Sequence, residues 1–184
     1  LVNGTAIAGN YSVLSVTVSH MAHKVPEAQL VLLDGDVSTA TFEVSNSADF
    51  IPGVEIEIKA GYHGQEETIF KGMVVKQAVK VLQGQSSVLN IVAKHDIFKT
   101  TLNRKNTSFK DKKDSEVIES LIPGSSDVDA TTTQHKHLLQ SFCTDWDFIN
   151  LRAEANGMFV LPKYDKIQVK APVLDADAVL SLYY

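Results

Sequence analysis

The sequence predicts a β-rich α+β fold, made of small β-barrels with two or three helices. Through much of residues 1–95, apolar and polar residues alternate, which is the pattern of strands with one buried face. Turn signals separate these short segments at regular intervals, as in a sandwich or a barrel. After residue 95 the pattern changes to helix signals and a final hairpin. We therefore expect a first β-barrel domain over residues 1–95, and helical segments plus strands of a second, incomplete domain over residues 96–184.

The first three strands are predicted within residues 11–45. In residues 11–20, Leu14, Val16 and Val18 alternate with serine and threonine, so these three side chains should be buried. The apolar run over residues 28–33 is a second strand, closed by an Asp-Gly turn signal. The short segment TFEVS follows and completes the set.

Residues 54–62 give the clearest half-buried strand, because every second residue is apolar. A longer strand or a bent strand pair follows over residues 67–81. Within it, Gly72 suits a bulge or a barrel corner, where a missing side chain permits the bend. Residues 86–95 then complete a hairpin after a Gln-Gly turn.

Two helical segments are predicted next. Residues 96–105 suggest a helical turn, and a helix follows that Asp114 would cap and a Pro-Gly pair at 123–124 would end. The basic stretch at 105–113 and the polar stretch at 125–134 both read as loops. The basic stretch is either solvated or an electrostatic docking surface for a partner.

The stretch CTDWDFINLRAEANGM, which starts at the only cysteine, predicts a third helix. Apolar residues fall at Leu139, Phe142, Trp146, Ile149 and Ala153, spaced 3, 4, 3 and 4, so they form one stripe on an α-helix. An Asn-Gly pair then gives the left-handed residue that commonly ends a helix. We therefore expect a buried or subunit-facing cluster around Trp146, followed by a hairpin that turns near residues 162–165.

Asp145, Asp147 and Glu154 define the alternative function, a glycan-hydrolysing enzyme. The two aspartates lie about 100° to either side of Trp146 on a helix, so they cannot share its face. Glycosidase carboxylates usually come from different elements, so that the sugar fits between them. We expect solvated helix flanks or local caps, and we assign no catalytic residue.

Metal and cofactor chemistry have weak support. His135 and His137 are two residues apart, so their rings do not share a helical face, and Cys143 has no second cysteine to complete a zinc site. We expect a histidine contact at a helix start and a small buried side chain at Cys143. There is no glycine-rich phosphate loop and no nucleophile elbow, so no cofactor is expected.

Composition argues against several partners. The net charge of −5 opposes wrapping of a nucleic acid, which needs a basic surface. One cysteine forms no internal disulfide, and no apolar run approaches the roughly 20 residues that span a bilayer. The first residues lack a basic region, so we expect no signal peptide and synthesis in the cytoplasm.

Three segments carry a resemblance to a known family. FKGMVVKQ begins at Phe70, LNIVAKHDIFKTTLNRKNTSFKDKKDSEVIESLI begins at Leu89, and QHKHLLQSFCTDWDFINLRAEANGMFVLPKYDKIQVKAP ends at Pro172. Together they resemble the N-terminal hub region of Vgr-like spike proteins, which include VgrG of type VI secretion systems and the baseplate hubs of contractile phage tails. The D-W-D-F block followed by R-A-E and G-M is the most specific part. His95, in front of the usual Asp96, is a small departure.

The resemblance implies a phage-tail hub-like fold and a structural role without enzyme activity. The chain would form a homotrimer in which each copy supplies two small barrels. The six barrels would match a hexameric tube protein, and a spike would follow, with effector or spike-tip proteins as further partners. Such an apparatus is assembled in the cytoplasm and exported to the cell exterior or a target cell. Its target membrane is reached only through the spike, and no nucleic acid is involved.

The expected interface lies on the strand faces at Val54–Tyr62 and Phe70–Val81. Opposite charges there would set register more than affinity. Within the D-W-D-F block, Arg152 would lie over the Phe148 ring or pair with a carboxylate across a packed interface. The interface and core candidates are Trp146, Phe148, Arg152, Glu55, Glu57, Lys59, Lys71 and Lys76.

Overall fold

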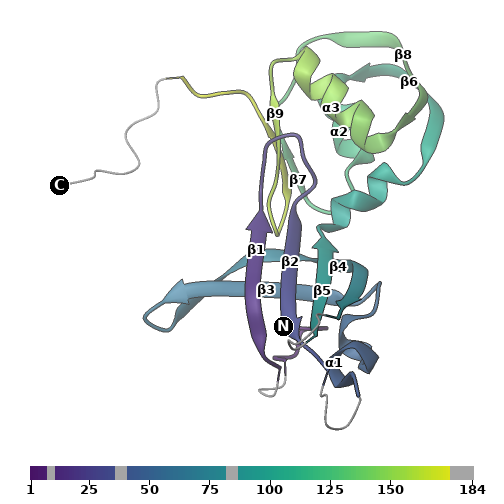
Figure 1. Ribbon diagram of the computed structural model, residues 1–184. Coiled ribbons are helices and arrows are strands. Elements are labelled where there is room, and N and C mark those ends of the chain that lie inside the picture. Colours follow the sequence, from purple (N-terminus) through teal and green to yellow (C-terminus); the bar gives the residue numbers. More distant parts are fainter. Residues whose placement is uncertain (8–10, 36–40, 82–86, 175–184) are drawn as a thin grey trace.

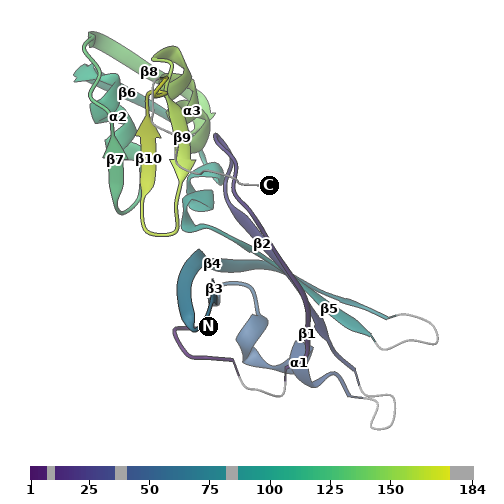
Figure 2. The same cartoon turned by 90° about the vertical axis from the view of Figure 1, so that its left-hand side faces the viewer.

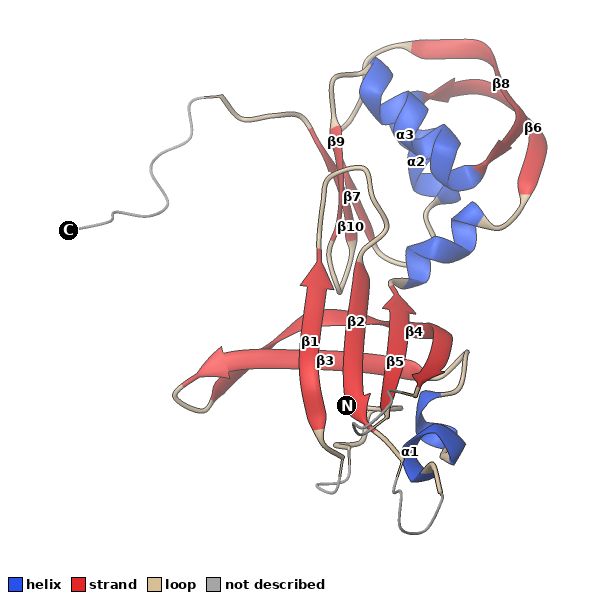
Figure 3. Ribbon diagram, viewed as in Figure 1, coloured by secondary structure: helices blue, strands red, loops and turns tan. Residues whose placement is uncertain are grey.

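The computed structural model describes residues 1–7, 11–35, 41–81 and 87–174 of the 184-residue chain. In chain order the elements are β1 Val13–Ser19, β2 Glu27–Leu33, α1 Glu43–Asn46, the 3₁₀ helix η1 Ala48–Phe50, β3 Glu55–Tyr62, β4 Gln65–Lys80, β5 Val88–Lys94, the 3₁₀ helix η2 Asp96–Thr101, β6 Arg104–Lys113, α2 Asp114–Leu121, β7 Ser126–Val128, β8 Gln134–Thr144, α3 Asp145–Ala155, β9 Phe159–Pro162 and β10 Ile167–Lys170. The fold is β-rich with few helices, as the sequence predicts (Figure 3).

The first five strands form one antiparallel sheet that curls into a half-barrel. Its order is β1-β2-β5-β4-β3, and β1 and β3 are its edges (Figures 1 and 2). The long strand β4 pairs with β3 up to Met73 and with β5 from Met73 onward. At this change of partner, a Cβ on Gly72 would lie 2.2 Å from the carbonyl oxygen of Lys94. Gly72 is therefore the residue that lets the sheet turn its corner.

Alternate residues of β2, β4 and β5 fill the concave side of this sheet. They pack with side chains from α1 and η1, which cover one end of the half-barrel (Figure 1). The segment TFEVS is thus part of a short helix and its lead-in, and the predicted strand there is wrong. The buried members of this first cluster are Val2, Ala28, Leu30, Leu32, Val44, Phe50, Ile56, Phe70, Val74, Leu89, Ile91 and Ala93.

The burial predicted for β1 is also wrong. Leu14 is 56% exposed and Val16 is 45% exposed, and only Val18 packs against the first cluster. β1 pairs with β2 on one side alone, because the sheet is a half-barrel that does not close back onto its first strand. Alternation in the sequence shows which side chains share a face of the strand. It does not show whether that face is covered, and on an edge strand it can stay exposed to solvent.

The second half of the chain combines α2 and α3 with two small sheets. β6 and β8 form a two-stranded antiparallel ribbon, and β7, β10 and β9 form a three-stranded sheet in that order. The hairpin of β9 and β10 is as predicted, and β7 adds a short parallel strand within the stretch expected to be a loop. The second buried cluster is Ile97, Ile118, Ile122, Trp146, Ile149, Ala153, Met158, Val160, Ile167 and Val169.

The third helix begins later than its apolar stripe predicts. Residues up to Thr144 belong to β8, and Leu139 and Phe142 are 64% and 65% exposed. The helix α3 starts at Asp145, where the Thr144 hydroxyl accepts a hydrogen bond from the Asp147 N–H at 3.0 Å. Only the C-terminal half of the stripe is helical.

The basic stretch at 105–113 is strand β6, so its assignment as a loop is wrong. It pairs with β8 from Arg104 opposite Thr144 to Lys113 opposite Gln134. α2 follows directly, with Lys113 as its N-cap residue and Asp114 as its first helical residue. The Glu116 carboxylate accepts from the Lys113 N–H at 2.8 Å, which satisfies one backbone donor at the helix start.

The two halves meet at a waist formed by the β1–β2 turn, residues 20–24, and by the crossing of the chain at residues 95–96. The His23 N–H donates to the Val160 carbonyl at 2.8 Å, and the His95 N–H donates to Pro26 at 3.0 Å. Val25 packs against the second cluster. The boundary between domains at residue 95 stays a prediction, although each half has its own buried cluster.

Candidate functional site

The D-W-D-F block supplies packing for the second cluster. Trp146 is 8% exposed and lies with Ile149 among the buried residues, whereas Leu139 and Phe142 lie outside that cluster. Phe148 is buried and stacks on Phe109 of β6, with 6.0 Å between the ring centroids. The block therefore fixes α3 against the ribbon and the small sheet.

Arg152 pairs with a carboxylate, which was the second of its two predicted roles. Its Nε and Nη2 donate to the two carboxylate oxygens of Asp114 at 2.6 and 2.9 Å. Asn156 Nδ2 donates to the same carboxylate at 2.9 Å, and His135 Nε2 lies 3.1 Å from it. The predicted histidine contact at a helix start is thus made by His135, across from β8 to α2.

Asp114 is almost fully buried, and its ionisation depends on these partners. Burial raises its pKa, but the hydrogen bonds from Arg152, Asn156 and His135 outweigh burial and lower the pKa to about 2. The carboxylate is ionised at neutral pH and both oxygens are occupied by donors. It joins α2, α3 and β8, and it has no free oxygen for proton transfer.

The carboxylates of the hydrolase alternative do not converge. Asp145 is buried and accepts hydrogen bonds from Lys105 Nζ at 2.6 Å and Gln140 Nε2 at 2.9 Å, so the expected solvation of Asp145 is wrong. Asp147 is exposed, and Glu154 lies 3.9 Å from His23 on the surface. Five pockets along the described residues are lined by other side chains.

The predicted interface residues of β3 and β4 lie on the protruding hairpin and on the strands that lead to it. Glu55, Lys59, Lys71 and Lys76 are exposed. Glu57 is half-buried and accepts a hydrogen bond from the Thr68 hydroxyl at 2.6 Å; this bond and nearby lysines lower its pKa. Lys59 lies 3.6 Å from Glu57 within the same chain, and the interface role of all five side chains stays a prediction.

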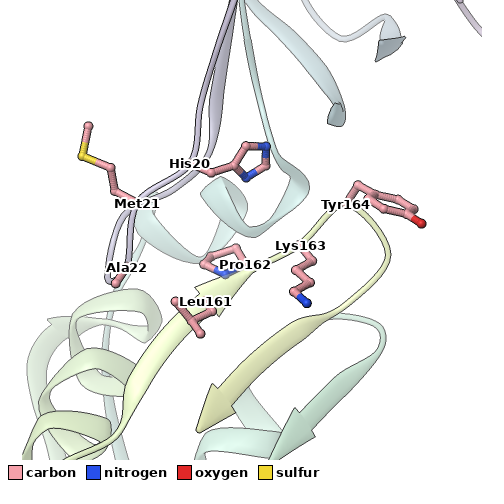
Figure 4. A pocket seen from close by; sticks show the side chains of 7 residues that line it. All are labelled: His20, Met21, Ala22, Leu161, Pro162, Lys163 and Tyr164. Atoms are coloured by element: carbon pink, nitrogen blue, oxygen red, sulfur yellow. The ribbon is translucent and has the colours of Figure 1, made fainter. Parts of the chain in front are cut away.

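A pocket of about 370 Å³ lies at the waist (Figure 4). Its walls come from the β1–β2 turn and the β9–β10 hairpin. His20 holds its place through an Nε2 contact of 2.9 Å with the Ile69 carbonyl. The pocket lacks serine, cysteine and carboxylate side chains, so it offers binding surface without hydrolytic groups. The lining residues are His20, Met21, Ala22, Leu161, Pro162, Lys163 and Tyr164.

Metal binding, a buried cysteine and a membrane-spanning helix have no support in the part of the chain that the structure describes. No group of three His, Cys, Asp or Glu side chains there is placed to hold a metal ion. Cys143 is partly exposed, so its expected burial is wrong. No helix among the described residues is long and apolar enough to cross a membrane.

The half-barrel sheet is joined at a waist to a helical part with small sheets. This arrangement is a phage-tail hub-like fold. A component of the type VI secretion system of E. coli, described as similar to the T4 bacteriophage tail proteins gp27 and gp5, matches 87% of this chain with a TM-score of 0.60 and 9% identity. A tail protein of Neisseria meningitidis matches 92% with a TM-score of 0.59 and 14% identity. A Francisella PdpA–VgrG complex matches 89% with a TM-score of 0.57 and 11% identity.

The chain belongs to the Alg8 N-terminal domain family, whose model matches residues 1–184. A search of curated proteins finds no match. The chain spans 48% of the E. coli protein, 53% of the Neisseria protein and 25% of the Francisella chain. The resemblance to Vgr-like proteins is therefore supported for the fold, whereas the matching family model is a different one.

Proposed function

We propose that this chain is a structural hub component of a contractile injection apparatus of the type VI or phage-tail kind. The observation that carries the proposal is the shared fold. Nine-tenths of the chain follows the arrangement found in tail proteins and in a type VI secretion component. The TM-scores of these matches support a common architecture despite the low sequence identities, and the role is our inference from that architecture.

In this proposal the chain forms a homotrimeric base that mates a hexameric tube to a puncturing spike. With two barrels per chain, of which the described residues show one half-barrel, three chains would present six similar surfaces and so resolve the mismatch between threefold and sixfold symmetry. The exposed charges of β3 and β4 suit contacts with neighbours, because charge pairs set register more than affinity. Effector or spike-tip proteins are further partners; the Francisella neighbour was solved as a complex of VgrG with PdpA.

The proposed location follows from the same assignment. The chain would be assembled in the cytoplasm and then carried to the cell exterior or into a target cell by the apparatus. Any target membrane would be met by the spike.

The mass in solution tests the proposal. For the natural full-length protein, light scattering coupled to size exclusion should give three times the chain mass. The chain of 184 residues by itself can dissociate on dilution, because weak interfaces follow mass action. A full-length protein that stays monomeric at high concentration would remove the hub assignment.

The same preparation should hydrolyse no glycan, because the described carboxylates do not converge and Asp145 is held by Lys105 and Gln140. The measurement is release of soluble fragments from peptidoglycan, with buffer as background. Turnover that disappears in Asp145→Asn would establish the hydrolase instead.

A further inference from the structure

We propose that the outer face of the β6–β8 ribbon docks the acidic β3–β4 hairpin of a neighbouring copy of this chain. The inference rests on the proposed assembly from several copies, and it names the two surfaces that meet. It goes beyond the predicted strand-face interface, because it assigns the partner surface to the ribbon.

The ribbon concentrates positive charge on an acidic protein. Its two strands carry six cationic side chains and one acidic one, whereas the rest of the chain carries 11 cationic and 21 acidic ones. Among the described residues, Lys105 is the ribbon lysine held in an ion pair, with Asp145. Arg104 lies over the Phe142 ring, and the other four lysines form no ion pair in the described part of the chain. The cations are Arg104, Lys105, Lys110, Lys112, Lys113 and Lys136.

The pairing register places apolar and cationic side chains together on the outer face. Ser108 lies opposite Leu139 and Lys110 lies opposite His137; these pairs are two residues apart and share a face. The intervening pair, Phe109 and Leu138, belongs to the other face, where Phe109 stacks on α3. The exposed Leu139 therefore shares its face with Lys110, and Lys112 opposite His135 is the next pair in this register.

Phe142 is held outward by a local distortion. At the bulge of β8, Ser141 and Phe142 stand opposite Asn106 alone, and Phe142 has a φ of 44°. This left-handed conformation is unfavourable for a phenylalanine, and it persists where the surrounding structure enforces it. Here the Asn106 side chain accepts a hydrogen bond from the Phe142 N–H at 2.9 Å, and the Arg104 guanidinium lies 5.2 Å from the ring centre. An exposed aromatic ring that is fixed in this way is suited to docking.

The β3–β4 hairpin has the complementary features. Between Glu55 and Ile69 it carries four acidic side chains and one lysine. Its tip presents Tyr62, which is 87% exposed. A shallow hollow with a volume of about 660 Å³ lies beside Tyr62, and Ile69 and Glu67 contribute to its lining. Glu57 is paired with Lys59 within the hairpin, which leaves Glu55, Glu66 and Glu67 to face the ribbon cations. This hollow can then receive an apolar side chain such as Phe142.

The placement of the two surfaces requires separate copies. The hairpin projects sideways from the lower half of the molecule, and the ribbon lies at the far end of the upper half (Figures 1 and 2). A hairpin therefore cannot reach the ribbon of its own chain. Contacts between two different patches are heterologous, and they generate rings when the rotation closes. A nucleic acid would match the cations alone and would be repelled by the remaining surface.

Charge reversal in the natural full-length protein tests the contact. Lys110→Glu with Lys112→Glu on the ribbon, or Glu66→Lys with Glu67→Lys on the hairpin, should each weaken self-association at least tenfold by sedimentation at 150 mM salt. Combining all four changes should restore the association to within about threefold of wild type. Phe142→Ala should weaken it as well. Lys24→Glu, an exposed lysine at the waist, is the matched control and should change nothing.

The outcomes separate the contact from the hub assignment. If the protein is a trimer and the charge reversals leave its self-association unchanged, the ribbon contact is overturned and the proposed function stands. If the wild-type protein is monomeric at every concentration, both are overturned. Binding of a labelled oligonucleotide that the ribbon reversal abolishes, with the trimer unchanged, would assign the ribbon to nucleic acid and overturn the contact.

Discussion

Asp114 shows how one side chain can join elements that are distant in the sequence. It lies at the start of α2, and its partners Arg152 and Asn156 follow 38 and 42 residues later on and just after α3. The sequence left two roles open for Arg152, stacking over Phe148 or pairing with a carboxylate, and the structure shows the second. The sequence could not show which carboxylate, because that depends on how α2 and α3 pack.

The lowered pKa of Asp114 predicts a loss of stability in acid. The pKa falls from 3.8 to about 2 on folding, so the ionised group stabilises the fold above pH 4 by roughly 2 kcal/mol. This contribution is lost as the pH falls from 4 to 2. In Asp114→Asn the unfolding free energy should be lower at pH 7 and should change less over this range.

Chemical denaturation at pH 7, 4, 3 and 2 measures that difference. Asp111→Asn is the control, because Asp111 is exposed and asparagine tolerates its φ of 50°. Parallel pH profiles for wild type and Asp114→Asn would show that the carboxylate does not contribute in this way.

Trp146 is predicted to be a main contributor to the stability of the second cluster. Truncation by Trp146→Ala removes a buried ring and leaves a cavity, so the unfolding free energy should fall by about 3–5 kcal/mol. Leu151→Ala on the same helix is the control, because Leu151 is 56% exposed and its loss should cost little. An unchanged melting temperature in Trp146→Ala would contradict the burial.

At the scale of elements, strand patterns were more informative than helix boundaries. The strands around residues 28–33, 54–62 and 67–81 follow local alternation and turn signals, and these predictions are confirmed. The start of α3 was missed because β8 is defined by pairing with β6, some 30 residues earlier. A spacing of 3 and 4 cannot reveal such a partner, nor can it show that Lys105 and Gln140 bury Asp145.

Gly72 gives a prediction at this scale. In Gly72→Ala the new methyl group would overlap the backbone of Lys94, so β4 or β5 must shift and the fold should lose about 1–3 kcal/mol. Thermal melting compares it with Lys76→Ala, an exposed change on the same strand. Equal melting temperatures for the two variants would mean that the corner accepts a side chain.

At the scale of the whole molecule, the buried residues form two separate clusters, one in each half. Phe70→Ala should therefore speed hydrogen exchange mainly in β2, β4 and β5, and Ile149→Ala mainly in α2, α3 and β10. Mass spectrometry of peptic fragments reads both patterns. Exchange that rises equally throughout the chain in either variant would show a single cooperative unit.

The waist also determines how the two halves can move. The upper half is attached by the covalent crossing at residues 95–96 and by the turn at residues 20–24. The hydrogen bond from the His95 N–H to the Pro26 carbonyl places the crossing next to the end of the turn. Because these two attachments are neighbours, we expect rocking about an axis through them to strain them less than pulling the halves apart. The pocket beside the turn lies next to this axis, so its width would follow the bending angle.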